Sequence, residues 1–90
     1  MLKPLRQSKS FSQSQLSSDS GVNLKMIQKY EQGVKNINNA RLETLLKLCI
    51  TLKCRLNELV TDPELQSLAK IYESLKESDH DGQVFQSQNM

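Results

Sequence analysis

The sequence contains few of the residues on which several classes of protein depend. Its 90 residues include no Trp, two Tyr, two Phe and one His, and aromatic residues make up 4% of the chain. RNA-binding modules stack unpaired bases on exposed aromatic side chains, so RNA binding is a less favoured function here. The single histidine, His80, has no nucleophile beside it, and the sequence shows neither a phosphate-binding loop nor a metal-ligand cluster. An enzyme is therefore not expected, and no cofactor or metal is predicted.

The two cysteines and the short apolar runs exclude further classes of protein. Cys49 and Cys54 are separated by four residues in an apolar stretch, without a neighbouring His or a second pair of cysteines. This pattern predicts that both cysteines are reduced thiols buried in a core. It matches neither a disulfide framework nor a zinc site. No apolar run approaches the roughly 20 residues that span a bilayer, and residues 1–4 begin no secretory signal. We therefore expect a cytoplasmic protein without a membrane partner.

Charge is distributed unevenly along the chain. The net charge is only +2, but residues 1–55 carry ten basic and three acidic side chains, for +7, whereas residues 56–90 carry two basic and seven acidic ones, for −5. Lys and Arg side chains near phosphates gain free energy because they release condensed counterions. The first half of the chain therefore favours a polyanion as partner, and the acidic second half is expected to point away from it.

The spacing of apolar residues predicts the fold. These residues recur at helical intervals almost throughout, and no segment alternates with the period of two that is typical of strands. The sequence therefore predicts an all-α fold in one domain, with Ser12, Gly21, Asn23 and Gly33 at helix ends. The expected helices are a short one near the N-terminus, 12–20, 23–32, one capped by Asn38 or Asn39 that continues to 52, 56–60, and 62–77.

Two of these helices have distinctive apolar surfaces. The fourth is apolar on most of its circumference and is expected to be the centre of the core. Its apolar residues are Leu42, Leu45, Leu46, Leu48, Cys49, Ile50 and Leu52. The sixth follows a capping box with Pro over residues 61–64 and is amphipathic. Its apolar stripe consists of Leu65, Leu68, Ile71, Tyr72 and Leu75. Residues 78–90 are rich in Asp, Gly, Gln, Ser and Asn and are expected to be a disordered tail.

The third helix has a polar face that suits DNA. At about 100° per residue, Tyr30, Glu31 and Val34 fall near Ile27 and should face inward. The residues on the opposite face or at its edge are Leu24, Lys25, Gln28, Lys29 and Gln32. Lys can donate to guanine, Gln can pair with adenine, and Leu can cover a thymine methyl in the major groove. Taken alone, the same face also fits an ordinary solvated surface.

Residues 11–33 resemble the helix-turn-helix of the phage Cro and repressor family, also called the XRE family. The resemblance rests on FSQSQL at 11–16, SGVN at 20–23 and IQKYEQG at 27–33. Downstream, LETLLKL at 42–48 and LNELV at 56–60 resemble the family's fourth and fifth helices, so the resemblance covers about residues 2–60. It implies a five-helix DNA-binding domain over 1–61, followed by an extra C-terminal helix. It also implies a bacterial or phage-encoded protein that is associated with the nucleoid when bound.

The resemblance implies roles for particular residues. Arg6 and Glu31 match a partly buried ion pair that ties the first helix to the third, and its loss should cost stability. Ser17 occupies a position where a small residue is usual, so its hydroxyl should bond a backbone carbonyl one turn earlier. The residues that the resemblance places against bases or phosphates are Gln13, Asn23, Leu24, Lys25, Gln28, Lys29, Lys35 and Asn36.

The sixth helix offers a surface for assembly. One recognition helix reads few base pairs, so such modules commonly bind as dimers on half-sites about one helical turn apart. The apolar stripe is the expected homodimer surface, although it could instead fold back on the fourth and fifth helices. The sequence thus predicts a dimeric transcriptional regulator that binds operator DNA. A repressor is expected because repression is the commoner function in the family. The alternative is an antitoxin whose acidic residues 73–81 bind a basic toxin protein.

Overall fold

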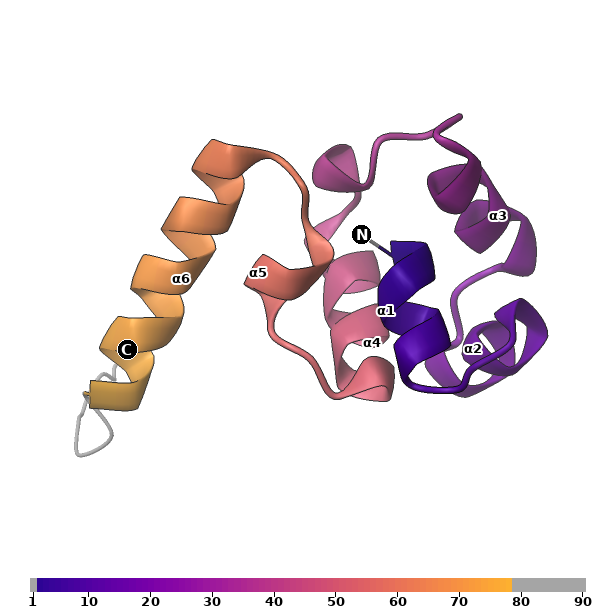
Figure 1. The fold of residues 1–90 in the computed structure, drawn as a ribbon, viewed down its shortest axis with the longest axis horizontal. Coiled ribbons are helices and arrows are strands. Elements are labelled where there is room, and N and C mark those ends of the chain that lie inside the picture. Colours follow the sequence, from indigo (N-terminus) through magenta and orange to yellow (C-terminus); the bar gives the residue numbers. More distant parts are fainter. Residues whose placement is uncertain (1, 79–90) are drawn as a thin grey trace.

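The computed structural model describes residues 2–78 and is all-helical over that range, with no strand between those residues (Figure 1). The predicted all-α fold is therefore confirmed. The predicted disordered tail lies outside the described residues, apart from the end of the last helix. The helices are α1 (Leu2–Ser8), α2 (Gln13–Ser20), α3 (Leu24–Gln32), the 3₁₀ helix η1 (Ile37–Asn39), α4 (Leu42–Leu52), α5 (Leu56–Leu59) and α6 (Pro63–Ser78).

The ends of α2 and α3 are where the sequence predicts them. The Ser12 hydroxyl accepts the N–H of Gln15 at 3.0 Å, and the Asn23 side chain accepts the N–H of Lys25 at 2.8 Å. Gly21 and Gly33, both at φ 79°, end the two helices in the left-handed region, where glycine pays no steric penalty.

The start of α4 differs from the prediction. Asn38 and Asn39 were expected to cap α4, but they belong to η1, and α4 begins only at Leu42. Asn38 instead connects distant segments of the chain: its side-chain oxygen Oδ1 accepts the backbone N–H groups of Thr61 and Asp62 at 2.8 and 2.9 Å. The Asn38 side chain therefore bonds the backbone of the segment between α5 and α6. Because its oxygen is used there, Asn38 does not cap α4.

The N-terminus of α6 lies one residue later than a cap at Thr61 would place it. The Asp62 carboxylate accepts the N–H of Leu65 at 3.0 Å, and Pro63 is the first helical residue. Proline suits this position because its missing N–H would be unpaired there anyway.

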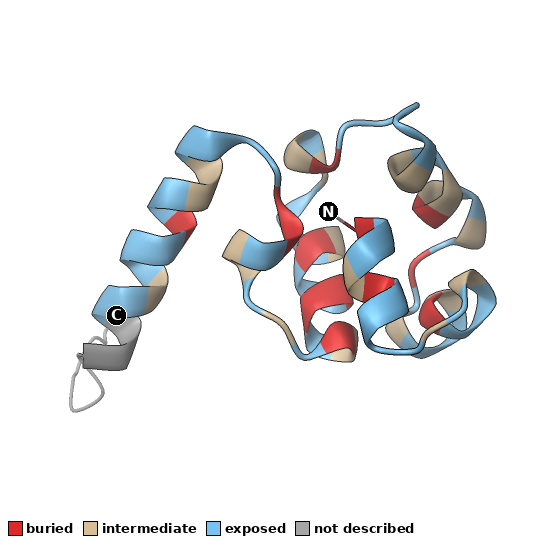
Figure 2. Cartoon of the chain, in the orientation of Figure 1, coloured by how far each residue is buried: buried red, intermediate tan, exposed pale blue. Residues whose placement is uncertain are grey.

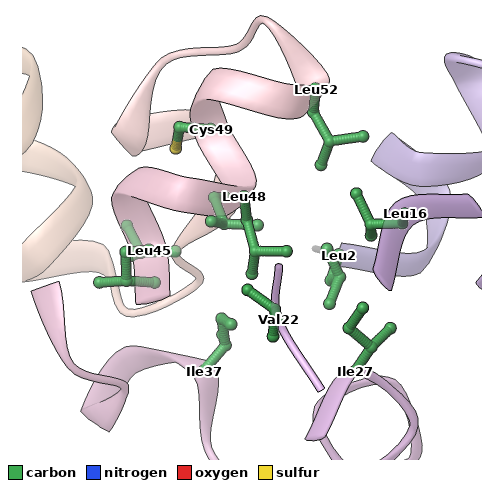
Figure 3. Close-up of a cluster of buried hydrophobic side chains, with 11 residues drawn as sticks. Leu2, Leu16, Val22, Ile27, Ile37, Leu45, Leu48, Cys49 and Leu52 are labelled. Atoms are coloured by element: carbon green, nitrogen blue, oxygen red, sulfur yellow. The ribbon is translucent and has the colours of Figure 1, made fainter. Parts of the chain in front are cut away.

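One face of α4 forms the centre of the core. Figure 3 shows Leu48 between Leu45, Val22 and Leu2, and Leu48 is fully buried. Although α4 is apolar on most of its circumference, not all of its apolar residues are buried: Leu42, Leu46 and Ile50 are 62%, 45% and 74% exposed. The other helices cover only one side of α4. The described core residues are Leu2, Leu16, Val22, Ile27, Ile37, Leu45, Leu48, Cys49, Leu52, Leu59 and Val60.

The end of α3 also differs from the prediction. Val34 was expected to face inward with Ile27, but it is 68% exposed. Gly33 ends the helix, so the helical wheel no longer applies to Val34. Ile37, three residues later in η1, is buried in the core instead.

The last helix packs on the domain through one side only. Leu65 packs against the core and Ala69 is buried, while the Glu73 carboxylate accepts the backbone N–H of Leu56, the first residue of α5, at 2.9 Å. The opposite side is exposed (Figure 2). Its large apolar residues are Leu68, Ile71, Tyr72 and Leu75, each more than half exposed. One side of α6 thus packs back on its own domain, while the other side faces outward.

The domain is elongated, and α6 lies at one end of it. The described protein measures 39 × 26 × 23 Å, and Figure 1 shows α6 and the α2–α3 pair at opposite ends of the longest dimension. Among residues 2–78, no helix is both long enough and apolar enough to cross a membrane.

Candidate nucleic-acid interface

The helices α2 and α3 are joined by a tight turn that fixes their relative position. Val22 in the turn is buried in the core, and the Ser17 hydroxyl donates to the Val22 carbonyl at 2.7 Å. We expected Ser17 to bond a carbonyl one turn earlier in its own helix; its partner instead lies across the turn. The hydroxyl therefore ties α2 directly to the segment that leads into α3.

The exposed face of α3 carries the polar residues that the sequence predicts. Ile27 points into the core and is fully buried, whereas Lys25 and Lys29 are exposed and Gln28 is half-buried. Leu24 opens the helix and is half-buried beside the cap residue Asn23. The burial of Ile27 thus orients both lysines toward solvent. Their amino groups are free to meet an anionic partner.

A buried ion pair holds α3 against α1. The Arg6 Nε donates to Glu31 Oε2 at 2.7 Å and Nη2 donates to Oε1 at 3.0 Å, a bidentate geometry. The third guanidinium contact is Nη1 to the Phe11 carbonyl at 2.8 Å. The side chains of Arg6 and Glu31 are 9% and 3% exposed. This pairing is the one that the resemblance implied.

Two glutamines extend this pair to the exposed face. Gln13, the first residue of α2, donates through Nε2 to Glu31 Oε1 at 2.9 Å, and Gln28 donates to Gln13 Oε1 at 3.4 Å. The chain of contacts therefore runs from Arg6 in the interior to Gln28 on the outer face of α3. Sequence reasoning assigned Gln13 and Gln28 to DNA and missed their contact with each other. Nothing in the spacing of residues 13 and 28 indicates it.

The charge of Glu31 is stabilised by these neighbours. Burial is the largest single influence and raises the pKa of Glu31, but hydrogen bonds from Arg6 and Gln13, with the charges of Arg6 and Lys3, together lower it below its usual value. Glu31 is therefore an anion at neutral pH, and its two oxygens orient both Arg6 and Gln13.

The remaining predicted residues lie beyond α3. Lys35 and Asn36 are exposed in the segment between Gly33 and η1. The Asn36 side-chain oxygen accepts the N–H of Asn38 at 3.0 Å and also its side-chain amide at 2.9 Å, so Asn36 caps η1. In the part of the chain that the structure describes, no cluster of His, Cys, Asp or Glu is suited to a metal ion.

Together, the helix order, the tight turn and the exposed polar face of α3 define a helix-turn-helix DNA-binding protein. The chain belongs to the Cro/C1-type HTH DNA-binding domain family, whose model matches residues 1–65. The resemblance to the XRE family is therefore confirmed. Searches among curated proteins and among solved structures gave no match.

Proposed function

We propose that this chain is a sequence-specific transcriptional regulator, a cytoplasmic repressor that occludes a promoter by binding an operator in double-stranded DNA. The observation that carries the proposal is the recognition face of α3, on which Lys25 and Lys29 are exposed around the half-buried Gln28. A rigid helix end of this composition suits the major groove, where lysine can donate to guanine O6 and N7 and glutamine can pair with adenine.

The network behind α3 supports this proposal because it orients the side chains before DNA arrives. Gln28 and Gln13 are held through Glu31, so their amides lose little conformational freedom on binding. Gln13 donates one amide hydrogen to Glu31 and keeps the other for a phosphate, and the side-chain amide of the exposed Asn36 would supply another phosphate contact. Phosphate contacts set the register of the protein on the duplex, while Leu24, Lys25, Gln28 and Lys29 would supply base readout.

The proposal includes a homodimer formed through α6. Leu68, Ile71, Tyr72 and Leu75 repeat at three and four residues, and this spacing makes one continuous exposed stripe. We call these four residues the α6 stripe. Leu65, predicted to belong to the same surface, packs on the core of its own chain. Because α6 and α3 lie at opposite ends of the protein, a second copy on the stripe leaves both recognition helices free (Figure 1).

Selection from a random pool of DNA duplexes tests the function as a whole. We expect the retained sequences to converge on a palindrome whose half-sites are separated by a whole number of helical turns. A palindrome reports sequence-specific binding and twofold symmetry in one experiment. Retained sequences that share no motif would contradict sequence-specific regulation.

Substitution of the recognition lysines tests the proposed contacts. Lys25→Ala and Lys29→Ala should each weaken binding to the selected operator by about 1–3 kcal/mol where the lysine reads a base. Where it contacts a phosphate, the slope of log affinity against log salt should fall by about one. Lys70→Ala is the matched control, since it removes the same charge from α6. Salt titrations in which both variants behave like Lys70→Ala would remove these lysines from the interface.

An antitoxin is the second candidate, and the α6 stripe is what favours it. Of the acidic residues 73–81 that were predicted to bind the toxin, Glu73 bonds Leu56 of its own chain, and residues 79–81 lie outside the described residues. The exposed apolar residues of α6 fit a different protein as well as a second copy. Co-purification of this chain with a small basic protein from its native source would support the antitoxin. A purified homodimer that binds its operator alone would support the repressor.

A further inference from the structure

Cys49 and Cys54 form a thiol pair at the C-terminal end of α4. Both are free cysteines; Cys49 is buried in the core, whereas Cys54 is partly exposed. Cys49 belongs to the core, Cys54 packs against it, and the pKa of each thiol is shifted by the other, so the two side chains are neighbours.

The backbone holds the two cysteines together. Lys53 is in the left-handed region at φ 52°, and the Cys54 N–H donates to the Cys49 carbonyl at 3.1 Å. The Lys53 N–H donates to the Ile50 carbonyl at 3.3 Å. These two bonds constitute a Schellman motif, which ordinarily brings two apolar side chains together across the end of a helix. Here two thiols occupy the contact. A disulfide requires about 4.4–6.8 Å between Cα atoms. The 3.1 Å bond from the Cys54 N–H to the Cys49 carbonyl keeps the two backbone segments close.

The surroundings make the two thiols unequal. The hydrogen bond from Cys49 lowers the pKa of Cys54 against the effect of its burial; Lys9 lowers it further, while Glu58 and Glu73 oppose the shift. The same hydrogen bond, together with burial, raises the pKa of Cys49. Cys54 is partly exposed and Cys49 is buried, so a reagent in solvent reaches Cys54 first. Cys54 is therefore the nucleophile of the pair and Cys49 is its resolving partner.

We propose that Cys49 and Cys54 are a redox-modification site that reacts with hydroperoxides and closes into an intramolecular disulfide. The Cys54 thiolate attacks a peroxide oxygen; the O–O bond breaks, Cys54 becomes a sulfenic acid, and the second oxygen leaves as hydroxide or alkoxide. The Cys49 sulfur then displaces the sulfenic oxygen. The S–S bond forms, the S–O bond breaks, and the oxygen leaves as water with the Cys49 proton. Two thiols thus lose two electrons, and the hydroperoxide gains them.

The site is separate from the DNA-binding face. Figure 3 shows Cys49 on the side of α4 turned away from Leu16 and Ile27, which belong to α2 and α3. The charged groups nearest Cys54 include Glu58 in α5 and Glu73 in α6. A disulfide there would act first on the packing of α5 against α4, and through α5 on α6.

Mass spectrometry of the full chain tests the proposal. The reduced protein is treated with hydrogen peroxide and then with an alkylating agent, and its intact mass is compared with that of untreated protein. We expect a loss of about 2 Da, no alkylation, a single chain on a non-reducing gel, and recovery of both thiols with a dithiol. Cys49→Ser should accumulate a Cys54 sulfenic acid that a 1,3-diketone traps, whereas Cys54→Ser should leave Cys49 unoxidised.

Three results would overturn the proposal: two thiols that still alkylate fully after peroxide, chains cross-linked between molecules, or a Cys54→Ser variant in which Cys49 oxidises as fast as in the wild type. The first measurement needs no substitution, so it decides even where a variant fails to fold. Operator binding plays no part in the readout, and the result is independent of the proposed function.

Discussion

Replacing Glu31 with Gln should lower the free energy of unfolding by about 3 kcal/mol or more, the largest effect on stability that we expect from one polar substitution. The carboxylate is 3% exposed and accepts two bonds from Arg6 and one from Gln13. Without its charge, the Arg6 guanidinium remains buried with only the Phe11 carbonyl and a neutral amide as partners. An uncompensated buried charge is costly because the interior cannot replace its hydration.

Chemical denaturation monitored by circular dichroism measures this effect. The control is Glu43→Gln, which removes the surface pair of Glu43 with Lys47 at 3.2 Å. The Glu43 side chain is 69% exposed, so its loss should change stability by less than about 1 kcal/mol. A double variant, Arg6→Met with Glu31→Leu, should recover most of the lost stability, because apolar replacement of a whole buried pair is often neutral. Equal effects of Glu31→Gln and Glu43→Gln would show that the buried pair contributes no stability.

The same substitution should change how stability depends on pH. The pKa of Glu31 in the folded protein is lowered, despite the raising effect of burial, by Arg6 and Gln13. Its contribution is therefore complete above the pKa of the unfolded chain, about 4.3, and is lost as the pH falls through the lower folded value. The difference in stability between wild type and Glu31→Gln should be constant near neutral pH and should narrow below about pH 4.

The sequence predicted the elements whose signals are local. Ser12, Asn23 and the two glycines at 21 and 33 each act within a few residues, so the ends of α2 and α3 follow from the chain alone. Arg6 and Glu31 are 25 residues apart, so their ion pair was predicted only from the family resemblance.

The predictions that were wrong concern residues whose bonding or burial depends on a distant segment of the chain. An asparagine before an apolar run can cap a helix or a turn, and the connection between α5 and α6 takes the Asn38 side chain. Likewise, an apolar helix does not indicate how many of its sides are covered. α4 is covered on one side only, so Ile50 is exposed although its neighbour Cys49 is buried.

Replacing Ile71 with Glu should convert the proposed homodimer into a monomer and weaken operator binding about 100-fold or more. In a twofold interface each α6 stripe meets its own copy, so one substitution buries two like charges. A dimer also gains effective concentration for its second half-site, typically about 10²–10⁴-fold, and a monomer loses this gain. Ile71 is 55% exposed in the isolated chain, so the fold itself should persist.

Sedimentation equilibrium and operator titration measure the two consequences, and Lys70→Glu is the matched control. Lys70 precedes Ile71 on α6 but lies off the stripe, on an exposed position. The Lys70→Glu substitution should leave both dimerisation and operator affinity close to wild type, because the new charge lies outside the interface and stays solvated. A wild-type chain that stays monomeric with and without operator would contradict dimerisation. An Ile71→Glu chain that remains dimeric would contradict the α6 stripe as its interface, and the exposed Leu42, Leu46 and Ile50 of α4 would then be the next surface to substitute.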